Sequence, residues 1–201
     1  MNGKISTRDR IVAAGRKAML EQGYEGTGIG PLLASVAVPK GSFYHFFASK
    51  EDFAAAVLAA YADQYRQQRQ ELFADAGLSP MARIERHLVQ LERDTTSEAN
   101  AAGCLYGVLA QAAPGLGAEL RGRLNEVFAA WEQDLAALIV EAQRAGEVDA
   151  ALDPVETAAH VIDGYEGAVI RARAGDEPAA FARFRKFTLA MLKRATGAEP
   201  R

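Results

Sequence analysis

The chain has 201 residues, of which 49% are hydrophobic and 24% charged, with a net charge of -3 at pH 7. This composition is ordinary for a globular protein, and no apolar run approaches the roughly 18 residues that cross a bilayer, so we expect no membrane segment. The polar N-terminus does not look like an export signal, and a single cysteine, Cys104, fits a reducing compartment. Both features favour a cytoplasmic protein. One cysteine also excludes a cysteine-based zinc cluster within one chain, and no cofactor is expected.

The charge is distributed unevenly along the chain. Residues 1–50 hold seven basic and three acidic side chains, a net charge of +4, so the remaining residues carry -7. A basic segment attached to an acidic body is typical of a protein with one end that meets a polyanion, because only the contacting face has to attract phosphate. Such an asymmetry also arises by chance on charged surfaces, so its meaning depends on the motifs inside the segment.

The pattern of apolar residues predicts an all-α protein with about nine helices. Apolar residues recur at spacings of three and four, and no strand-length alternation occurs. The first helix is predicted to start at Ser6, whose hydroxyl can cap it, and to end at Gly23. Later helix starts are marked by capping residues or prolines at Ser49, Ser79-Pro80, Asp153-Pro154 and Glu177-Pro178.

Two short helices are predicted to follow the first one. The apolar residues of segment 29–36 are spaced as one helical face, and the break Ala37-Val38-Pro39 ends that helix. The next helix is predicted from Pro39, acceptable at a first helical position, to about Phe47. A longer helix followed by two short ones across a tight turn is the geometry of a helix-turn-helix, in which the second short helix enters the major groove of DNA.

The side chains of that second short helix divide by face. Phe43 and either Phe46 or Phe47 are spaced to pack inward. Gly41 lets the backbone approach DNA closely, and Lys50 is placed to meet a neighbouring phosphate. The side chains left outside have donors and flat rings suited to phosphates and base edges: Lys40, Ser42, Tyr44 and His45.

Residues 38–52 read VPKGSFYHFFASKED, and this segment is similar to the signature of the TetR family of repressors. Supporting matches upstream extend the resemblance over roughly residues 7–56. The resemblance implies a three-helix DNA-binding domain over residues 1–48. It also implies a C-terminal helical domain over residues 49–201 that dimerises and binds a small molecule. In the family, the matching positions that commonly lie at the DNA surface are Thr27, Lys40, Ser42, Tyr44, His45 and Lys50.

The sequence departs from the family pattern at two places. Ala37 stands in the turn where the family usually has glycine, and if this position needs a positive φ, alanine costs on the order of 1 kcal/mol. Gly28 and the Gly30-Pro31 pair replace the more usual polar start of the second helix. We therefore expect Gly30 to cap that helix and Pro31 to be its first residue, which puts the phosphate contact of Thr27 in question.

The C-terminal part offers candidates for effector binding. Residues 103–111, GCLYGVLAQ, resemble a branch of the family that includes sensors of reactive electrophiles and small unsaturated acids. Cys104 is a candidate sensor thiol, with a small buried residue as the alternative. Four further side chains with an apolar body and a polar handle are candidates for an effector cavity, with core packing as the alternative: Tyr106, Trp131, His160 and Tyr165. His87 and His160 lie on different predicted helices without ligand-like spacing, so no metal site is predicted.

The last two predicted helices have the features of a dimer interface. Small residues such as Gly164 and Gly167 permit close approach of helices, and Phe181, Phe184 and Met191 lie on one stripe of the final helix. Two helices from each subunit would form a four-helix interface about a two-fold axis, which matches a palindromic operator. Packing within one subunit is the alternative explanation of the same pattern.

Three functions remain to be compared. The leading hypothesis is a repressor that a small molecule releases from a palindromic operator, and it predicts no turnover. An all-helical enzyme would need a nucleophile with its base or a metal cluster, and neither is visible with one cysteine and three scattered histidines. A DNA-coating protein without sequence preference is disfavoured by the acidic body and the modest basic charge.

Overall fold

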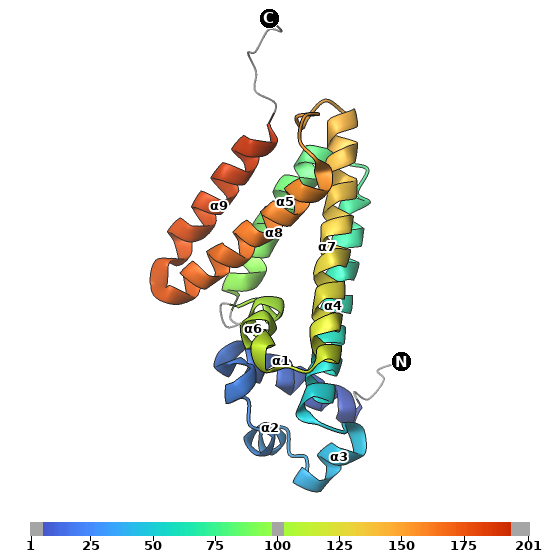
Figure 1. Cartoon of the computed structure of the whole chain (residues 1–201), viewed down its shortest axis with the longest axis vertical. Coiled ribbons are helices and arrows are strands. Elements are labelled where there is room, and N and C mark those ends of the chain that lie inside the picture. The colour runs from blue at the N-terminus through green and yellow to red at the C-terminus, as the bar shows by residue number, and fades with distance from the viewer. Residues whose placement is uncertain (1–5, 98–102, 194–201) are drawn as a thin grey trace, which may run out of the picture. The chain divides into compact units, whose positions relative to one another are not determined.

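A computed structural model of the chain describes residues 6–97 and 103–193, and within these ranges it contains nine α-helices and no strand (Figure 1). The all-α prediction is confirmed. None of the helices in the described ranges combines the length and the hydropathy needed to cross a membrane. The helices are α1 (Thr7–Gly26), α2 (Ile29–Ser35), α3 (Phe43–Phe46), α4 (Lys50–Phe73), α5 (Pro80–Thr96), α6 (Leu105–Ala112), α7 (Ala118–Arg144), α8 (Pro154–Arg171) and α9 (Glu177–Leu192).

Several helices start where the capping residues predicted. The Ser6 hydroxyl accepts the N–H of Asp9 at 3.1 Å, and the hydroxyls of Ser49 and Ser79 each accept the N–H three residues further on, at 3.0 and 3.3 Å. The Asp153 carboxylate accepts two N–H groups of the first turn of α8, at 2.9 and 3.0 Å. Each such cap typically stabilises a helix by about 1 kcal/mol.

The helices form two compact units. The first unit consists of the described parts of residues 1–65 and 97–128, and the second of the described parts of residues 66–96 and 129–201. The predicted end of the DNA-binding domain at residue 48 stays a prediction, and the first compact unit continues past this residue into α4 and α6. It does so because α6 packs on α1, and because Phe53, in the first turn of α4, is fully buried against the same helix.

The core of the first unit centres on three phenylalanines. The rings of Phe43, Phe47 and Phe53 lie 5.1 to 5.5 Å apart, centroid to centroid. Phe53 also reaches Gly15 of α1, where an added Cβ would overlap its ring. Aromatic packing from α3 and α4 thus fixes α3 to the body of the unit and explains a glycine in the middle of α1.

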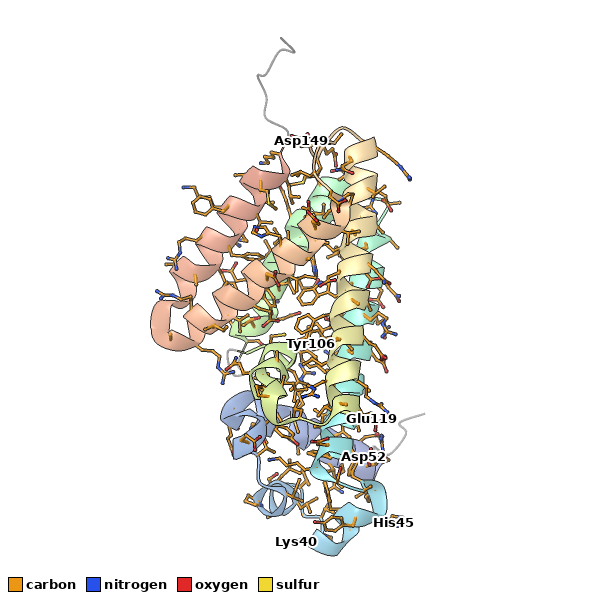
Figure 2. The ribbon with its side chains drawn as sticks, viewed as in Figure 1. Lys40, His45, Asp52, Tyr106, Glu119 and Asp149 are labelled. Carbon is orange, nitrogen blue, oxygen red and sulfur yellow. The ribbon has the colours of Figure 1, made fainter. Side chains whose placement is uncertain are left out.

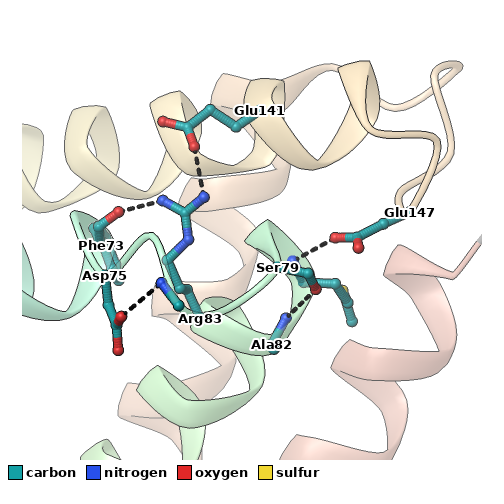
Figure 3. A network of polar contacts seen from close by, with 9 residues as sticks. Phe73, Asp75, Ser79, Ala82, Arg83, Glu141 and Glu147 are labelled. Carbon is teal, nitrogen blue, oxygen red and sulfur yellow. Dashed lines mark hydrogen bonds and ion pairs between the residues drawn. The ribbon is translucent and has the colours of Figure 1, made fainter.

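The second unit has a polar network at one end of its helices (Figure 3). The buried Arg83 of α5 donates to the carbonyl of Phe73, at the end of α4, and its guanidinium lies 2.9 Å from a Glu141 carboxylate oxygen of α7. Glu147, after α7, accepts the N–H of Met81 at 2.7 Å. These bonds satisfy the orphan carbonyl and N–H groups of two helix ends. Figure 1 shows α8 and α9 of the same unit lying side by side.

Candidate nucleic-acid interface

The first helix of the helix-turn-helix, α2, begins at Ile29 with Gly28 as its cap. The expectation that Gly30 caps this helix and Pro31 is its first residue is therefore wrong by two positions. The N–H of Leu32 donates to the Gly28 carbonyl at 3.2 Å and closes the first turn. Pro31 is tolerated at the third helical position, because N–H groups of a first turn have no partner within the helix and a missing one costs little.

The turn after α2 holds a residue with left-handed backbone. Ala37 has a φ of 53°, the sole positive φ of a non-glycine residue in the described part of the chain. Its N–H donates to the Ala34 carbonyl at 3.2 Å, and the Val38 N–H donates to the Leu33 carbonyl at 3.0 Å. This pair of bonds is the Schellman arrangement that usually places glycine where Ala37 stands. The alanine therefore carries strain of about 1 kcal/mol.

Two arginines of α1 contact the helix-turn-helix. The Arg10 guanidinium donates to the carbonyl of Val36, the residue that ends α2. The Arg8 guanidinium lies 5.3 Å from the centre of the Phe47 ring, in cation–π geometry. Both arginines are exposed, and sequence reasoning singled out neither as a contact residue. The available signal was their position in the first turns of a basic N-terminal helix.

The second short helix consists of a 3₁₀ turn, η1 (Lys40–Ser42), followed directly by α3, and we call residues 40–46 the recognition segment. The Pro39 carbonyl accepts the Ser42 N–H at 2.9 Å, so Pro39 caps the segment instead of being its first helical residue. Phe47 is extended and its N–H donates to the Phe43 carbonyl at 3.0 Å, which ends the helix.

The recognition segment has one buried and one exposed face. The Phe43 and Phe47 side chains are 1% and 2% exposed, whereas Tyr44 is 68% exposed. Phe46 is half-buried, with its ring edge-on to His45 at 5.1 Å. The other segment residues proposed to meet DNA are exposed, apart from the half-buried Ser42: Lys40, Gly41 and His45. Figure 2 shows Lys40 and His45 on this segment of the ribbon.

Two further residues expected at the DNA surface are engaged elsewhere. The Thr27 side chain is 1% exposed, and its hydroxyl donates to the Gly23 carbonyl at 2.7 Å. The expectation of a surface position is therefore wrong for this side chain, because the hydroxyl satisfies the end of α1 instead. The Lys50 ammonium is half-buried; it donates to the Glu25 carbonyl at 3.3 Å and lies 4.6 Å from the Tyr24 ring centre.

The effector candidates of the first unit lie together at the start of α6, with Cys104 as its N-cap and Tyr106 in its first turn. Cys104 is buried, and its Sγ lies 3.9 Å from the Tyr61 hydroxyl. Tyr106 is also buried, and its ring is 5.2 Å from that of Tyr61 and 5.6 Å from that of Phe128. Tyr61 was not predicted from the sequence, because its distance along the chain from α6 gives no local signal. The sulfur thus contacts Tyr61, which belongs to an aromatic cluster with Tyr106 and Phe128.

In the second unit, Trp131 and Tyr165 lie in contact, with ring centres 5.6 Å apart. The Trp131 indole donates to Nε2 of His87 at 3.2 Å, and the Tyr165 hydroxyl is 2.6 Å from the Thr95 hydroxyl. Burial, and secondarily the charge of Arg69, lowers the pKa of His87 from 6.5 to about 3. The imidazole is therefore neutral, and its Nε2 accepts the hydrogen bond from the indole N–H. His87 and Thr95 were not among the predicted effector residues.

The remaining effector candidate has a different environment. His160 is exposed and lines a groove of about 390 Å³ between α8 and α9, whereas Tyr165 on the same helix is buried. The structure therefore does not bring His160 into the cluster around Trp131. In the described residues, no group of three histidine, cysteine, aspartate or glutamate side chains is placed to hold a metal ion.

Comparisons with known proteins give consistent matches. The sequence model described as "Tetracyclin repressor-like, C-terminal domain" matches residues 80–188, and the one described as "Bacterial regulatory proteins, tetR family" matches residues 11–57. The transcriptional regulator AcuR of Cereibacter sphaeroides is 35% identical over 163 residues, which cover 81% of this chain and 74% of AcuR. The HTH-type transcriptional repressor DhaR of Mycobacterium sp. is 28% identical over 168 residues, which cover 84% and 83%.

Solved structures agree with these sequence matches. The regulatory protein TetR from Rhodobacter sphaeroides has a TM-score of 0.84 at 32% identity, over 91% of this chain and 97% of that one. The reduced form of NemR from Escherichia coli has the same fold, with a TM-score of 0.86 at 24% identity over 94% and 99%. The matches to both ends of the chain and to whole relatives show that this chain belongs to the TetR family of bacterial regulatory proteins.

Proposed function

We propose that the chain is a transcriptional repressor that binds a palindromic DNA operator as a homodimer and leaves it when a small molecule binds. One observation carries the DNA-binding part: the recognition segment buries Phe43 and Phe47 and exposes Lys40, Tyr44 and His45. An exposed helix with donors and an aromatic ring on its outer face suits a DNA groove. A relative named as a repressor supports repression as the output. Such a protein acts where the DNA is, in the cytoplasm.

The salt dependence of DNA binding tests the role of the recognition segment. Each phosphate contact that is lost reduces the slope of log affinity against log salt by about 0.9. We expect Lys40→Gln to weaken binding to all sequences and to reduce this slope, because it removes a cation. Tyr44→Ala is expected to weaken binding with little change of slope, because tyrosine is uncharged. Val89→Ala, which changes another exposed side chain, is the control. Full affinity in both variants of the recognition segment would remove it from the DNA interface.

Selection of bound fragments from random DNA separates the proposal from the alternatives. A repressor of this kind recovers a palindrome whose half-sites are spaced by about one helical turn. A DNA-coating protein recovers fragments without preference. An enzyme is the least supported alternative, since the relatives are named as regulators. Consumption of an effector added in excess would argue for an enzyme.

The groove between α8 and α9 supports the homodimer. Gly164 and Gly167 line it together with Phe187, which is 64% exposed. A large apolar side chain beside glycines on an exposed pair of helices suits a self-complementary interface about a two-fold axis. We expect Phe187→Glu to give a monomer in analytical ultracentrifugation. Val89→Glu, at a 48% exposed apolar position of α5, is the matched control. An unchanged dimer in Phe187→Glu places the interface elsewhere.

The effector is proposed to meet the aromatic side chains of one of the two units, and each unit offers a candidate cluster. Trp131 and Tyr165 in one unit and Cys104 and Tyr106 in the other combine apolar surfaces with single polar atoms, as small-molecule sites do. A thermal-shift screen of metabolites and electrophiles, with hits tested for release of selected DNA, identifies the effector. If electrophiles act through the thiol, Cys104→Ser abolishes the release. Unchanged release in that variant makes the buried cysteine a packing residue.

A further inference from the structure

A cationic hollow lies beside the recognition segment. It has a volume of about 310 Å³, and Thr7 and Arg10 of α1 line it together with Ser42 and His45 of the recognition segment. None of the residues that line it is acidic. The first turns of α1 and the outer face of the recognition segment therefore form one continuous surface, although they are more than thirty residues apart in sequence.

Arg10, which lines the hollow, and Arg8, two residues before it on α1, are already ordered. One donor of the Arg10 guanidinium is used by the Val36 carbonyl, and a guanidinium has five N–H groups. Arg8 is held against the ring of the buried Phe47. Contacts of this kind reduce the side-chain entropy that each arginine would lose on binding a ligand.

The acidic side chains nearest in sequence are engaged with backbone and hydroxyl groups. A carboxylate oxygen of Asp9 accepts the Ser6 hydroxyl proton at 2.7 Å. A carboxylate oxygen of Asp52 accepts the Ala48 N–H at 2.9 Å. Both carboxylates thus belong to the capping arrangements of α1 and α4, and neither of them lines the hollow.

We propose that the start of α1 contacts phosphates of the DNA backbone outside the recognition segment, Arg10 at the hollow that it lines and Arg8 beside that hollow. The inference rests on the proposed DNA binding by that segment and extends its footprint to the start of α1. Guanidinium groups suit phosphate because they present parallel donors to two of its oxygens, and the Thr7 and Ser42 hydroxyls add further donors. The contact is with the backbone, so it adds affinity and register without sequence preference.

Salt titrations of the full chain with a DNA fragment that it selects test this proposal. We expect Arg8→Gln and Arg10→Gln each to weaken binding about tenfold and to reduce the slope of log affinity against log salt by about 0.9. Lys17→Gln is the matched control, because it removes the same charge from the same helix at a residue placed 3.9 Å from Glu21. Arg10→Gln also loses the bond to Val36, so thermal unfolding is measured in parallel, and Arg8→Gln carries the test if Arg10→Gln is unstable.

The outcomes separate this contact from the recognition segment itself. Unchanged affinity and slope in Arg8→Gln, and in a stable Arg10→Gln, overturn the proposal. If Tyr44→Ala loses affinity in the same experiment, the recognition segment still binds DNA and only the contact at α1 is refuted. An equal loss of slope in Lys17→Gln also overturns it, because the effect is then one of overall charge. Losses in the arginine variants with full affinity in Tyr44→Ala and Lys40→Gln would instead refute the recognition segment as the DNA-binding element.

Discussion

Replacing Ala37 by glycine should stabilise the protein. Ala37 has a φ of 53° in the turn of the helix-turn-helix, where the hydrogen bonds of the turn involve its backbone alone. Alanine in this region brings its Cβ close to the following carbonyl oxygen, at a cost of about 1–2 kcal/mol, whereas glycine has no Cβ. The substitution keeps every bond of the turn and removes this strain.

The gain is smaller than the strain, because glycine also loosens the unfolded chain. That effect costs about 0.4–1 kcal/mol. The difference is a rise of about 0–1.6 kcal/mol in the free energy of unfolding of Ala37→Gly, with a central value of about 0.8 kcal/mol. In a protein of this size, 1 kcal/mol corresponds to about 2–4 °C in Tm.

Urea unfolding and thermal melts of two variants test this reasoning. Ala13→Gly is the control, because Ala13 is exposed in the middle of α1 and glycine in a helix interior costs about 1 kcal/mol. The same chemical change should therefore have opposite signs at the two positions. If Ala37→Gly destabilises the protein as much as Ala13→Gly does, the turn holds no strain at Ala37 and the reasoning is refuted.

Four further substitutions have expected effects on the free energy of unfolding. Gly15→Ala should lower it by about 1–3 kcal/mol through overlap with the Phe53 ring, whereas Gly122→Ala, which meets no neighbour, should raise it slightly. Asp153→Ala should lower the free energy of unfolding by about 1 kcal/mol, since α8 loses its cap. Urea titration measures the effect of these three substitutions. Because burial lowers the pKa of His87 to about 3, the unfolded chain binds a proton at His87 below pH 6.5 before the folded protein does. Stability from this group is complete above pH 6.5 and falls by roughly 1 kcal/mol per pH unit towards pH 3, and His87→Phe should remove that slope in melts across this range.

The helix starts and the two faces of the recognition segment could be predicted because both are local. A cap needs a side-chain oxygen and an N–H three residues away, as at Ser6 and Ser49. The burial of Phe43 and Phe47 follows from their spacing of four along one helical face. Neither feature depends on which distant helix comes to lie nearby.

The misplaced details come from positions where two local rules compete. Proline is favoured as a first helical residue, but it is also accepted at the third, so Pro31 did not fix the start of α2. Thr27 has a hydroxyl suited to phosphate, yet the carbonyl of Gly23 lies four residues before it and accepts the same proton. The sequence did contain a signal for the burial of the Thr27 side chain. Thr27 follows by four residues a glycine, Gly23, that interrupts a helix.

The effector candidates depend on contacts between distant helices and were only partly predictable. The sequence identified Trp131 as an amphipathic side chain, but it gave no sign that His87, on another helix, accepts a hydrogen bond from the indole N–H. The partner of the Cys104 sulfur is Tyr61 on α4, again far away in sequence. Helical periodicity tells which face of each helix is buried, and it does not tell which faces meet.

The difference between local and distant groups also explains how a protein with a negative net charge can bind DNA at one end. At physiological ionic strength, charges separated by more than about 8 Å are largely screened, so the net charge of -3 has little influence on a phosphate in contact with the recognition segment. What matters there is the local set of groups: Lys40 on the segment, and Arg8 and Arg10 held beside it by an aromatic ring and a helix carbonyl. The carboxylate of Asp9, between these arginines in sequence, accepts the Ser6 hydroxyl and does not line the hollow. The affinity for DNA is therefore expected to depend on where these few side chains lie, and not on the charge of the whole chain.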